Sequence, residues 1–154
     1  MEGGHEIEAN AFASELLMPT DLFKKVTDKQ KIDSLLLDKC TKYFGVSKTA
    51  FFLKYVEYGA YPIAIVFSEK GFIKWVNITE DFVLKFIKIG TKVPYNTVTM
   101  EVLKGNDAPI EPEIVEAISW FPDDFDISRF KNWSFKELCF KTGPDSILTC
   151  IWEL

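Results

Sequence analysis

Residues 6–19 read Glu-Ile-Glu-Ala-Asn-Ala-Phe-Ala-Ser-Glu-Leu-Leu-Met-Pro, and this stretch decides how the start of the chain folds. At about 100° per residue it predicts a helix with one apolar stripe, made of Ala9, Phe12, Ala13, Leu16 and Leu17. Glu6 and Asn10 lie one turn apart at the flank of that stripe, whereas Glu8 and Glu15 lie well away from it and are expected to be solvated. A carboxylate is rarely placed beside an apolar interface unless something pairs with it or binds it. Glu6 is therefore the residue to explain.

Two interpretations of Glu6 are open from the spacing alone. It can be an acidic residue near a helix N-terminus, where the helix dipole favours negative charge, or it can be a metal ligand. His5 is its neighbour, but adjacent residues do not face each other on a helix. We therefore expect His5, which follows Gly-Gly, to be solvated and not to bind metal with Glu6.

The same stretch resembles a helix of the ImmA/IrrE family of regulatory zinc metallopeptidases, which reads roughly E-x-x-A-N-x-F-A-x-x-L-L-M-P. The matching residues are Glu6, Ala9, Asn10, Phe12, Ala13, Leu16, Leu17, Met18 and Pro19. The resemblance implies that Glu6 is the third zinc ligand and that Asn10, one turn further on, orients a neighbouring ligand. If the register differs, Glu8 takes the place of Glu6.

The chain departs from the family pattern in its histidines. The family's other two zinc ligands and its general base come from an HExxH helix, but this sequence contains a single histidine. We therefore expect the sequence to be the C-terminal portion of such a peptidase, beginning just before the third-ligand helix. As it stands it is expected to contain no catalytic residue, to bind no zinc and to be inactive. In the full-length protein, zinc would polarise the peptide carbonyl and activate water.

Composition limits the remaining possibilities. The chain has 154 residues, of which 47% are hydrophobic and 15% aromatic, so it can form a substantial core. Its net charge of −5 provides no general attraction for a nucleic-acid backbone. Cys40, Cys139 and Cys150 are odd in number and show no CxxC spacing, which favours buried thiols in a reducing compartment. No segment reads as a signal peptide or a membrane span, so we expect a cytoplasmic protein that does not bind membranes.

Residues 1–59 are predicted to be helical. Thr20 or Asp21 is expected to cap a short helix that reaches Val26. An amphipathic helix then begins near Lys31 and ends at Gly45, followed by a helix that Ser47 caps and that extends to Gly59.

This arrangement resembles a helix-turn-helix. DNA binding through residues 47–54 is one interpretation, but the segment has only two lysines and no Arg, Asn or Gln for base contacts. We favour a helical hairpin that packs a core.

Residues 60–154 are predicted to form a small antiparallel sheet crossed by a helix, which makes the whole chain an α+β protein. Strands are expected at 63–67, 72–76, 114–121, 133–141 and 147–152, the first two as a hairpin. The crossing helix is expected at 80–89, ended by Gly90, and a loop at 102–112. The acidic cluster of Asp123, Asp124, Asp126 and Asp145 lacks the spacing of an oxygen-ligand metal site. Residues 122–124, Pro-Asp-Asp, are expected to be a solvated turn.

These patterns leave two main functional hypotheses. The first is the C-terminal portion of an ImmA/IrrE-type zinc metallo-endopeptidase, whose resemblance implies a transcriptional repressor or similar regulator as protein substrate. The second is a non-catalytic ligand-sensing or protein-binding module, with a pocket in the second half lined by Phe72, Trp75, Trp120 and Trp133. An exposed apolar side of the first helix would also favour a homodimer formed through that helix.

Overall fold

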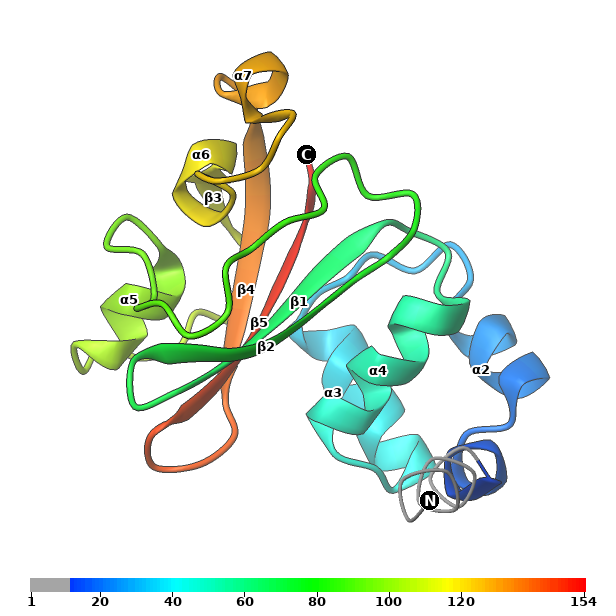
Figure 1. The fold of residues 1–154 in the computed structure, drawn as a ribbon. Coiled ribbons are helices and arrows are strands. Elements are labelled where there is room, and N and C mark those ends of the chain that lie inside the picture. The colour runs from blue at the N-terminus through cyan, green and yellow to red at the C-terminus, as the bar shows by residue number, and fades with distance from the viewer. Residues whose placement is uncertain (1–11) are drawn as a thin grey trace, which may run out of the picture. The chain divides into compact units, whose positions relative to one another are not determined.

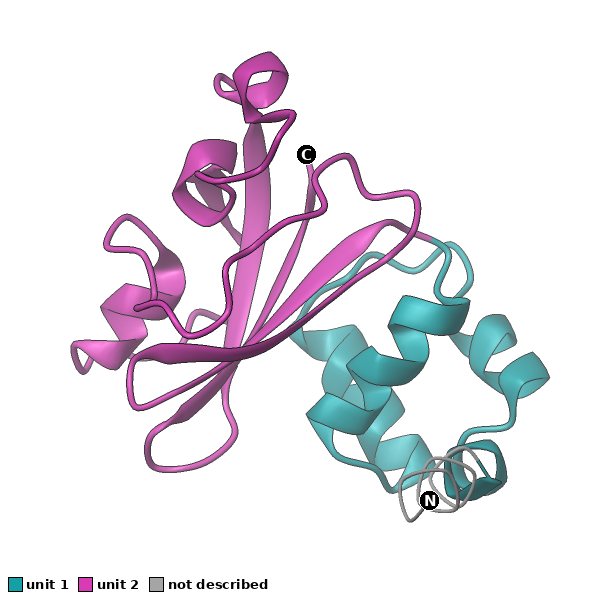
Figure 2. Ribbon diagram, in the orientation of Figure 1, with its two compact units in different colours: residues 1–60 teal, residues 61–154 magenta. Residues whose placement is uncertain are grey.

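The computed structural model describes residues 12–154, in which helices come first and a sheet follows (Figure 1). The chain forms two compact units, residues 1–60 and residues 61–154 (Figure 2). The first unit is helical, and the second combines a five-stranded antiparallel sheet with short helices. The predicted α+β class is therefore confirmed.

The first unit contains a helical segment at residues 12–17, followed by α2 (Thr20–Thr27), α3 (Ser34–Phe44) and α4 (Lys48–Tyr58). Gly45 ends α3 with a φ of 67°, a left-handed conformation that glycine adopts without steric cost. Ser47 caps α4 by accepting a hydrogen bond from the Ala50 N–H, at 3.1 Å. The predicted end of one helix and start of the next are thus confirmed.

Aromatic rings fill the core of the first unit. The Phe23 ring of α2 lies 5.5 Å from the Phe51 ring and 6.3 Å from the Tyr55 ring, both of α4. It also lies 6.2 Å from the Phe44 ring at the end of α3. All four side chains are buried. The hairpin of α3 and α4 therefore packs a core, as the favoured interpretation predicted, and Cys40 of α3 is buried as a free thiol.

The sheet of the second unit has the strand order β2-β1-β5-β4-β3, with all neighbours antiparallel. The strand bounds are β1 (Ile63–Glu69), β2 (Phe72–Ile78), β3 (Glu113–Glu116), β4 (Ser134–Lys141) and β5 (Ser146–Glu153). The β1–β2 hairpin turns at Lys70 and Gly71, which have φ values of 51° and 80°. Four of the five predicted strands are confirmed over most of their length.

The predicted strand at 114–121 is correct only in its first half. The strand ends at Glu116, and residues Ala117–Trp120 form the short helix α6. Ala117, Trp120 and Phe121 are all buried, which is the spacing of one helical face. The Phe121 N–H donates to the Ala117 carbonyl at 3.0 Å, as in a helical turn.

The helix predicted at 80–89 is wrong, because these residues belong to an irregular segment that runs from β2 to residue 97. Phe82, Leu84 and Ile87 of this segment are buried in a cluster with residues of the sheet, so the segment covers one sheet face (Figure 1). The N–H groups of Lys85 and Phe86 donate to the Asp124 carboxylate at 2.7 and 2.8 Å. Both N–H groups therefore have an acceptor without the backbone hydrogen bonds of the helix that the apolar spacing predicted. Gly90 lies in a turn with a φ of 84°.

Besides α6, two further short helices of the second unit were not predicted. α5 (Val98–Leu103) begins at Thr97, whose hydroxyl accepts from the Met100 N–H at 3.2 Å. It takes the first two residues of the predicted loop at 102–112. α7 (Ile127–Phe130) precedes β4.

A buried carboxylate joins α5 to the sheet. Glu137 of β4 has no exposed surface, and its Oε2 accepts from the Val98 N–H at 3.1 Å and from the Trp120 indole N–H at 3.0 Å. Its Oε1 accepts from the N–H and hydroxyl of Thr99 at 2.8 and 2.7 Å. The Thr99 hydroxyl also lies 2.5 Å from the Thr149 hydroxyl of β5. Burial raises the pKa of Glu137, while these hydrogen bonds oppose that rise. One side chain thereby ties together α5, α6 and the sheet.

We predict that Glu137→Gln destabilises the second unit, because the new amide NH₂ would face donors that now meet a carboxylate oxygen. The expected loss is about 1–3 kcal/mol in the free energy of unfolding. All four tryptophans lie in this unit, so urea unfolding followed by tryptophan fluorescence reports on it alone. Glu113→Gln is the control, because Glu113 is the exposed cross-strand neighbour of Glu137. Equal midpoints for both variants would show that the buried carboxylate has no special role.

Candidate functional site

The described part of the first helix, residues 12–17, presents its apolar side chains to solvent. Phe12 is 68% exposed, Leu16 65% and Leu17 54%, and Ala13 is also exposed. Met18, which follows the helix, is instead buried. The predicted metal ligand Glu6, its neighbour Asn10, the alternative ligand Glu8 and the single histidine His5 lie outside the described residues. Their predicted roles stay predictions.

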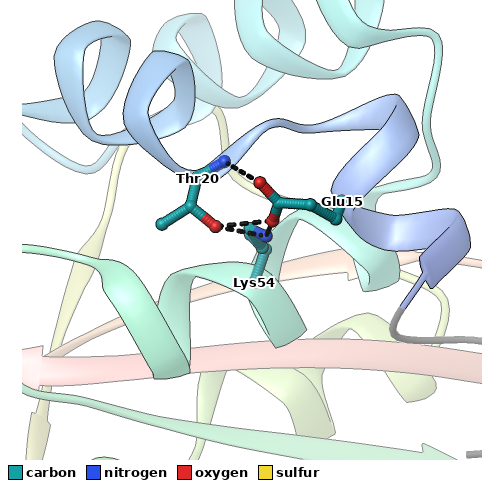
Figure 3. Close-up of polar contacts among 3 residues, drawn as sticks. All are labelled: Glu15, Thr20 and Lys54. Carbon is teal, nitrogen blue, oxygen red and sulfur yellow. Dashed lines mark hydrogen bonds and ion pairs between the residues drawn. The ribbon is translucent and has the colours of Figure 1, made fainter. Parts of the chain in front are cut away.

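Glu15 fixes this helical segment to the rest of the first unit (Figure 3). Its Oε1 accepts from the Thr20 N–H at 3.0 Å, and its Oε2 accepts from the Thr20 hydroxyl at 2.6 Å. Its Oε2 also accepts from the Lys54 ammonium of α4 at 2.9 Å. Neither Thr20 nor Asp21 caps α2 with its own side chain, contrary to the prediction, because Glu15 serves the first N–H of that helix.

The Lys54 ammonium is the buried member of this network. Its side chain is only 4% exposed, whereas that of Glu15 is 55% exposed. The Lys54 Nζ also donates to the Thr20 hydroxyl at 3.0 Å and lies 4.7 Å from the centre of the Tyr58 ring. A buried ammonium needs such partners, because its charge is costly to remove from water.

Glu15 was predicted to be solvated, and its side chain is 55% exposed although it also has hydrogen-bond partners. Hydrogen bonds from Thr20, followed by the hydrogen bond and charge of Lys54, lower the pKa of Glu15 from 4.5 to about 2. Lys54 was considered only as a possible DNA contact. The sequence did contain a signal that Lys54 is buried. Lys54 directly precedes Tyr55 and follows Phe51 by three residues, which places it on the apolar side of α4.

Among residues 12–154, no three His, Cys, Asp or Glu side chains come close enough to hold a metal ion together. The described residues therefore do not fit a zinc site. A site of the HExxH type would need Glu6 together with two histidines, and the whole sequence offers one histidine.

The acidic cluster of the second unit is structural at Asp124. Asp124 is buried, and its carboxylate accepts backbone N–H groups from Lys85, Phe86 and Asp126. The prediction of a wholly solvated turn is therefore wrong for this residue, because the irregular segment at 79–97 needs an acceptor there. Asp123 is exposed, as predicted.

The aromatic residues proposed to line one pocket lie in different surroundings. Trp120 is buried in the core, Trp75 stacks on Phe67 with ring centres 5.3 Å apart, and the Trp133 ring lies 4.8 Å from that of Phe130. Phe72 lines a cleft whose other walls come from α5 and two turns. The four side chains thus do not define the predicted pocket.

We predict that the Glu15 network stabilises the first unit in a pH-dependent way. Because the pKa of Glu15 is lower in the folded chain, its contribution is fully present above the ordinary value of 4.5 and is lost as the pH falls towards about 2. The unmodified chain should therefore have a higher urea midpoint than Glu15→Gln above pH 4.5, and this difference should shrink as the pH falls from 4.5 towards 2. Urea unfolding followed by helical circular dichroism at a series of pH values measures it.

The control for this experiment is Glu57→Gln, which changes an exposed carboxylate of α4 in the same way. It should leave the pH dependence of the unfolding midpoint unchanged. A gap between the unmodified chain and Glu15→Gln that stays constant from neutral pH to pH 2 would contradict the assigned role of Glu15.

Comparison with known proteins bears on the first unit. Residues 2–53 match the IrrE N-terminal-like domain of the M78 peptidases. No curated protein matches the chain. Among the described residues, no helix is both long enough and apolar enough to cross a bilayer. The matched range includes the stretch at 6–19 for which the sequence predicts a helix, together with α2, α3 and the first half of α4. This match supports the resemblance of residues 2–53 to the ImmA/IrrE family and to a metallopeptidase-like domain.

Proposed function

We propose that this chain is the C-terminal portion of a regulatory zinc metallo-endopeptidase that cleaves a transcriptional repressor or a similar regulator. In this proposal Glu6 is the third zinc ligand and Asn10 orients a neighbouring ligand. The two histidines and the general base come from an HExxH helix outside the present sequence. The chain as it stands binds no zinc and is inactive.

The orientation of the first helix is the observation that carries this proposal. Glu15 faces Lys54 of the same unit through a 2.9 Å ion pair. Glu6 precedes Glu15 by nine residues, so on the helix that the sequence predicts the two positions lie about 180° apart. Ala13 and Leu17 lie within roughly 20° of the Glu6 position by the same spacing, and both are exposed. The side assigned to Glu6 is thus open to a further segment.

DNA binding receives less support from the hairpin of α3 and α4. Of the two lysines on the helix that would enter a groove, Lys54 is buried against Glu15, and Lys48 lies 3.6 Å from Asp38 in an ion pair. Neither presents an unpaired charge to a phosphate backbone. We therefore propose a protein substrate for the complete enzyme and no nucleic-acid partner. The buried free thiols of Cys40, Cys139 and Cys150 fit a cytoplasmic location.

The test compares the zinc content of this chain with that of a chain extended at its N-terminus by the residues encoded upstream. We expect the extended protein to hold one zinc ion and to hydrolyse fluorescein-labelled casein, and the present chain to do neither. Glu6→Ala should remove the zinc, and Asn10→Ala should weaken zinc binding by about 10- to 100-fold.

Glu8→Ala is the matched control, because Glu8 is the alternative ligand two residues away. Loss of zinc with Glu8→Ala and not with Glu6→Ala would move the ligand assignment to Glu8. An extended protein without an HExxH segment, or one whose zinc content is unchanged by both substitutions, would refute the proposal and favour the non-catalytic module.

We also propose that two copies of the present chain associate through the open side of the first helix. Phe12, Leu16 and Leu17 expose apolar surface that a second copy would remove from water. Leu17→Asp should shift the sedimentation coefficient from dimer to monomer. Leu35→Asp is the control, because Leu35 is 71% exposed but lies on α3. A monomeric unmodified chain at high concentration would exclude this association.

A further inference from the structure

A cleft of about 590 Å³ opens in the second unit, and none of its lining residues was considered as a zinc ligand. Its walls come from the β1–β2 turn, the β4–β5 turn, α5 and the irregular segment before α5. Clefts of about 300–1,000 Å³ are the size of typical small-molecule sites. The volume alone therefore permits a ligand of ordinary metabolite size.

The floor and walls of the cleft are apolar. Val102 of α5 and Ile147 of β5 are buried beneath it. Met100 is half-buried on its wall, while Phe72 is 40% and Tyr95 71% exposed. Two aromatic rings with large accessible surfaces are thus available for contact with a flat apolar group.

The rim of the cleft is positively charged. Lys70, Lys92 and Lys141 line it, against one carboxylate, Asp145. No ion pair joins these lysines to a carboxylate within residues 12–154. This local excess of positive charge contrasts with the net charge of −5 on the whole chain. Three ammonium groups around one concavity attract an anion and repel one another when none is bound.

Backbone hydrogen bonds connect the segments that carry these lysines. The Lys70 N–H donates to the Asp145 carbonyl at 2.8 Å, and the Val93 N–H donates to the Gly71 carbonyl at 2.9 Å. Lys141 pairs with Ile147 at the ends of β4 and β5. The two turns and the segment before α5 are therefore joined without a ligand, which reduces the entropy lost on binding.

We propose that this cleft binds a small organic anion with a flat apolar body. The apolar body would contact Phe72, Tyr95 and Met100, and the acidic group would lie among Lys70, Lys92 and Lys141. This inference is independent of the proposed zinc site, because it concerns only the second unit. It assigns to that unit a ligand class, an aromatic or similarly planar carboxylate, sulfonate or phosphate.

The test uses the full chain and two dyes that differ in one charged group. 1-Anilinonaphthalene-8-sulfonate is an anion with a planar naphthalene ring, and N-phenyl-1-naphthylamine is its uncharged counterpart. We expect the sulfonate to bind with one-to-one stoichiometry and the uncharged dye to bind more weakly. Lys92→Glu or Lys70→Glu should raise the dissociation constant of the sulfonate about tenfold, with added salt weakening it further.

Lys74→Glu is the matched control, since Lys74 is exposed on β2 but does not line the cleft. It should leave the dissociation constant within about twofold. Amide shifts in a ¹⁵N-labelled chain locate the dye, because Gly71, Gly105 and Gly143 line the cleft whereas Gly45 belongs to the first unit. The sulfonate should shift the three cleft glycines and leave Gly45 unmoved.

Several outcomes would overturn the proposal. They are the absence of sulfonate binding, equal affinity for the two dyes, or equal weakening by Lys74→Glu and Lys92→Glu. A shift confined to Gly45 would place the dye in the first unit and would also exclude the cleft. None of these results bears on the zinc content of the extended chain, so the two proposals can fail separately.

Discussion

The fold of each unit depends on carboxylates that accept backbone N–H groups, from five residues away at Glu15 and from 38 or 39 residues away at Glu137 and Asp124. Buried N–H groups without an acceptor cost free energy comparable to a lost hydrogen bond. Glu15 serves the first N–H of α2, Glu137 serves two N–H groups at the start of α5, and Asp124 serves the irregular segment at residues 85 and 86. Glu137 and Asp124 thereby allow the start of α5 and an irregular segment to be buried, because both supply acceptors that neighbouring residues do not.

The same carboxylates mark the limit of prediction from the sequence. The Ser47 cap lies three residues from its donor, and Gly45 acts through its own φ angle, so both were predictable from local sequence. Glu137 meets donors 38 and 39 residues earlier in the chain. No local pattern indicates such a partner. Asp124 was accordingly assigned to solvent, and Glu137 was given no role.

The segment at 79–97 shows how a helical pattern can mislead. Apolar residues at 82, 83, 86, 87 and 89 have the spacing of an amphipathic helix, yet the segment is irregular and buries Phe82, Leu84 and Ile87. Tertiary packing against the sheet and the Asp124 carboxylate outweighed this local preference, which amounts to only tenths of a kcal/mol per residue. For the candidate site, by contrast, one short motif predicted the family, because it fixes acidic, amide, small and aromatic positions together.

The exposed first helix and the incomplete histidine set have one physical explanation under the proposed function. Full burial of a Leu or Phe side chain contributes about 1.5–3 kcal/mol to the free energy of folding or association. Phe12, Leu16 and Leu17 are each more than half exposed, so much of this contribution is not made within the first unit. The Glu15–Lys54 ion pair directs the side of the helix that carries Glu15 towards its own unit. The helix therefore cannot rotate Leu17, about 160° away by helical spacing, inwards without breaking this pair. A segment that carries the two missing histidines would have to pack on this open side to reach Glu6. The contact that completes the metal site would then also bury the apolar surface.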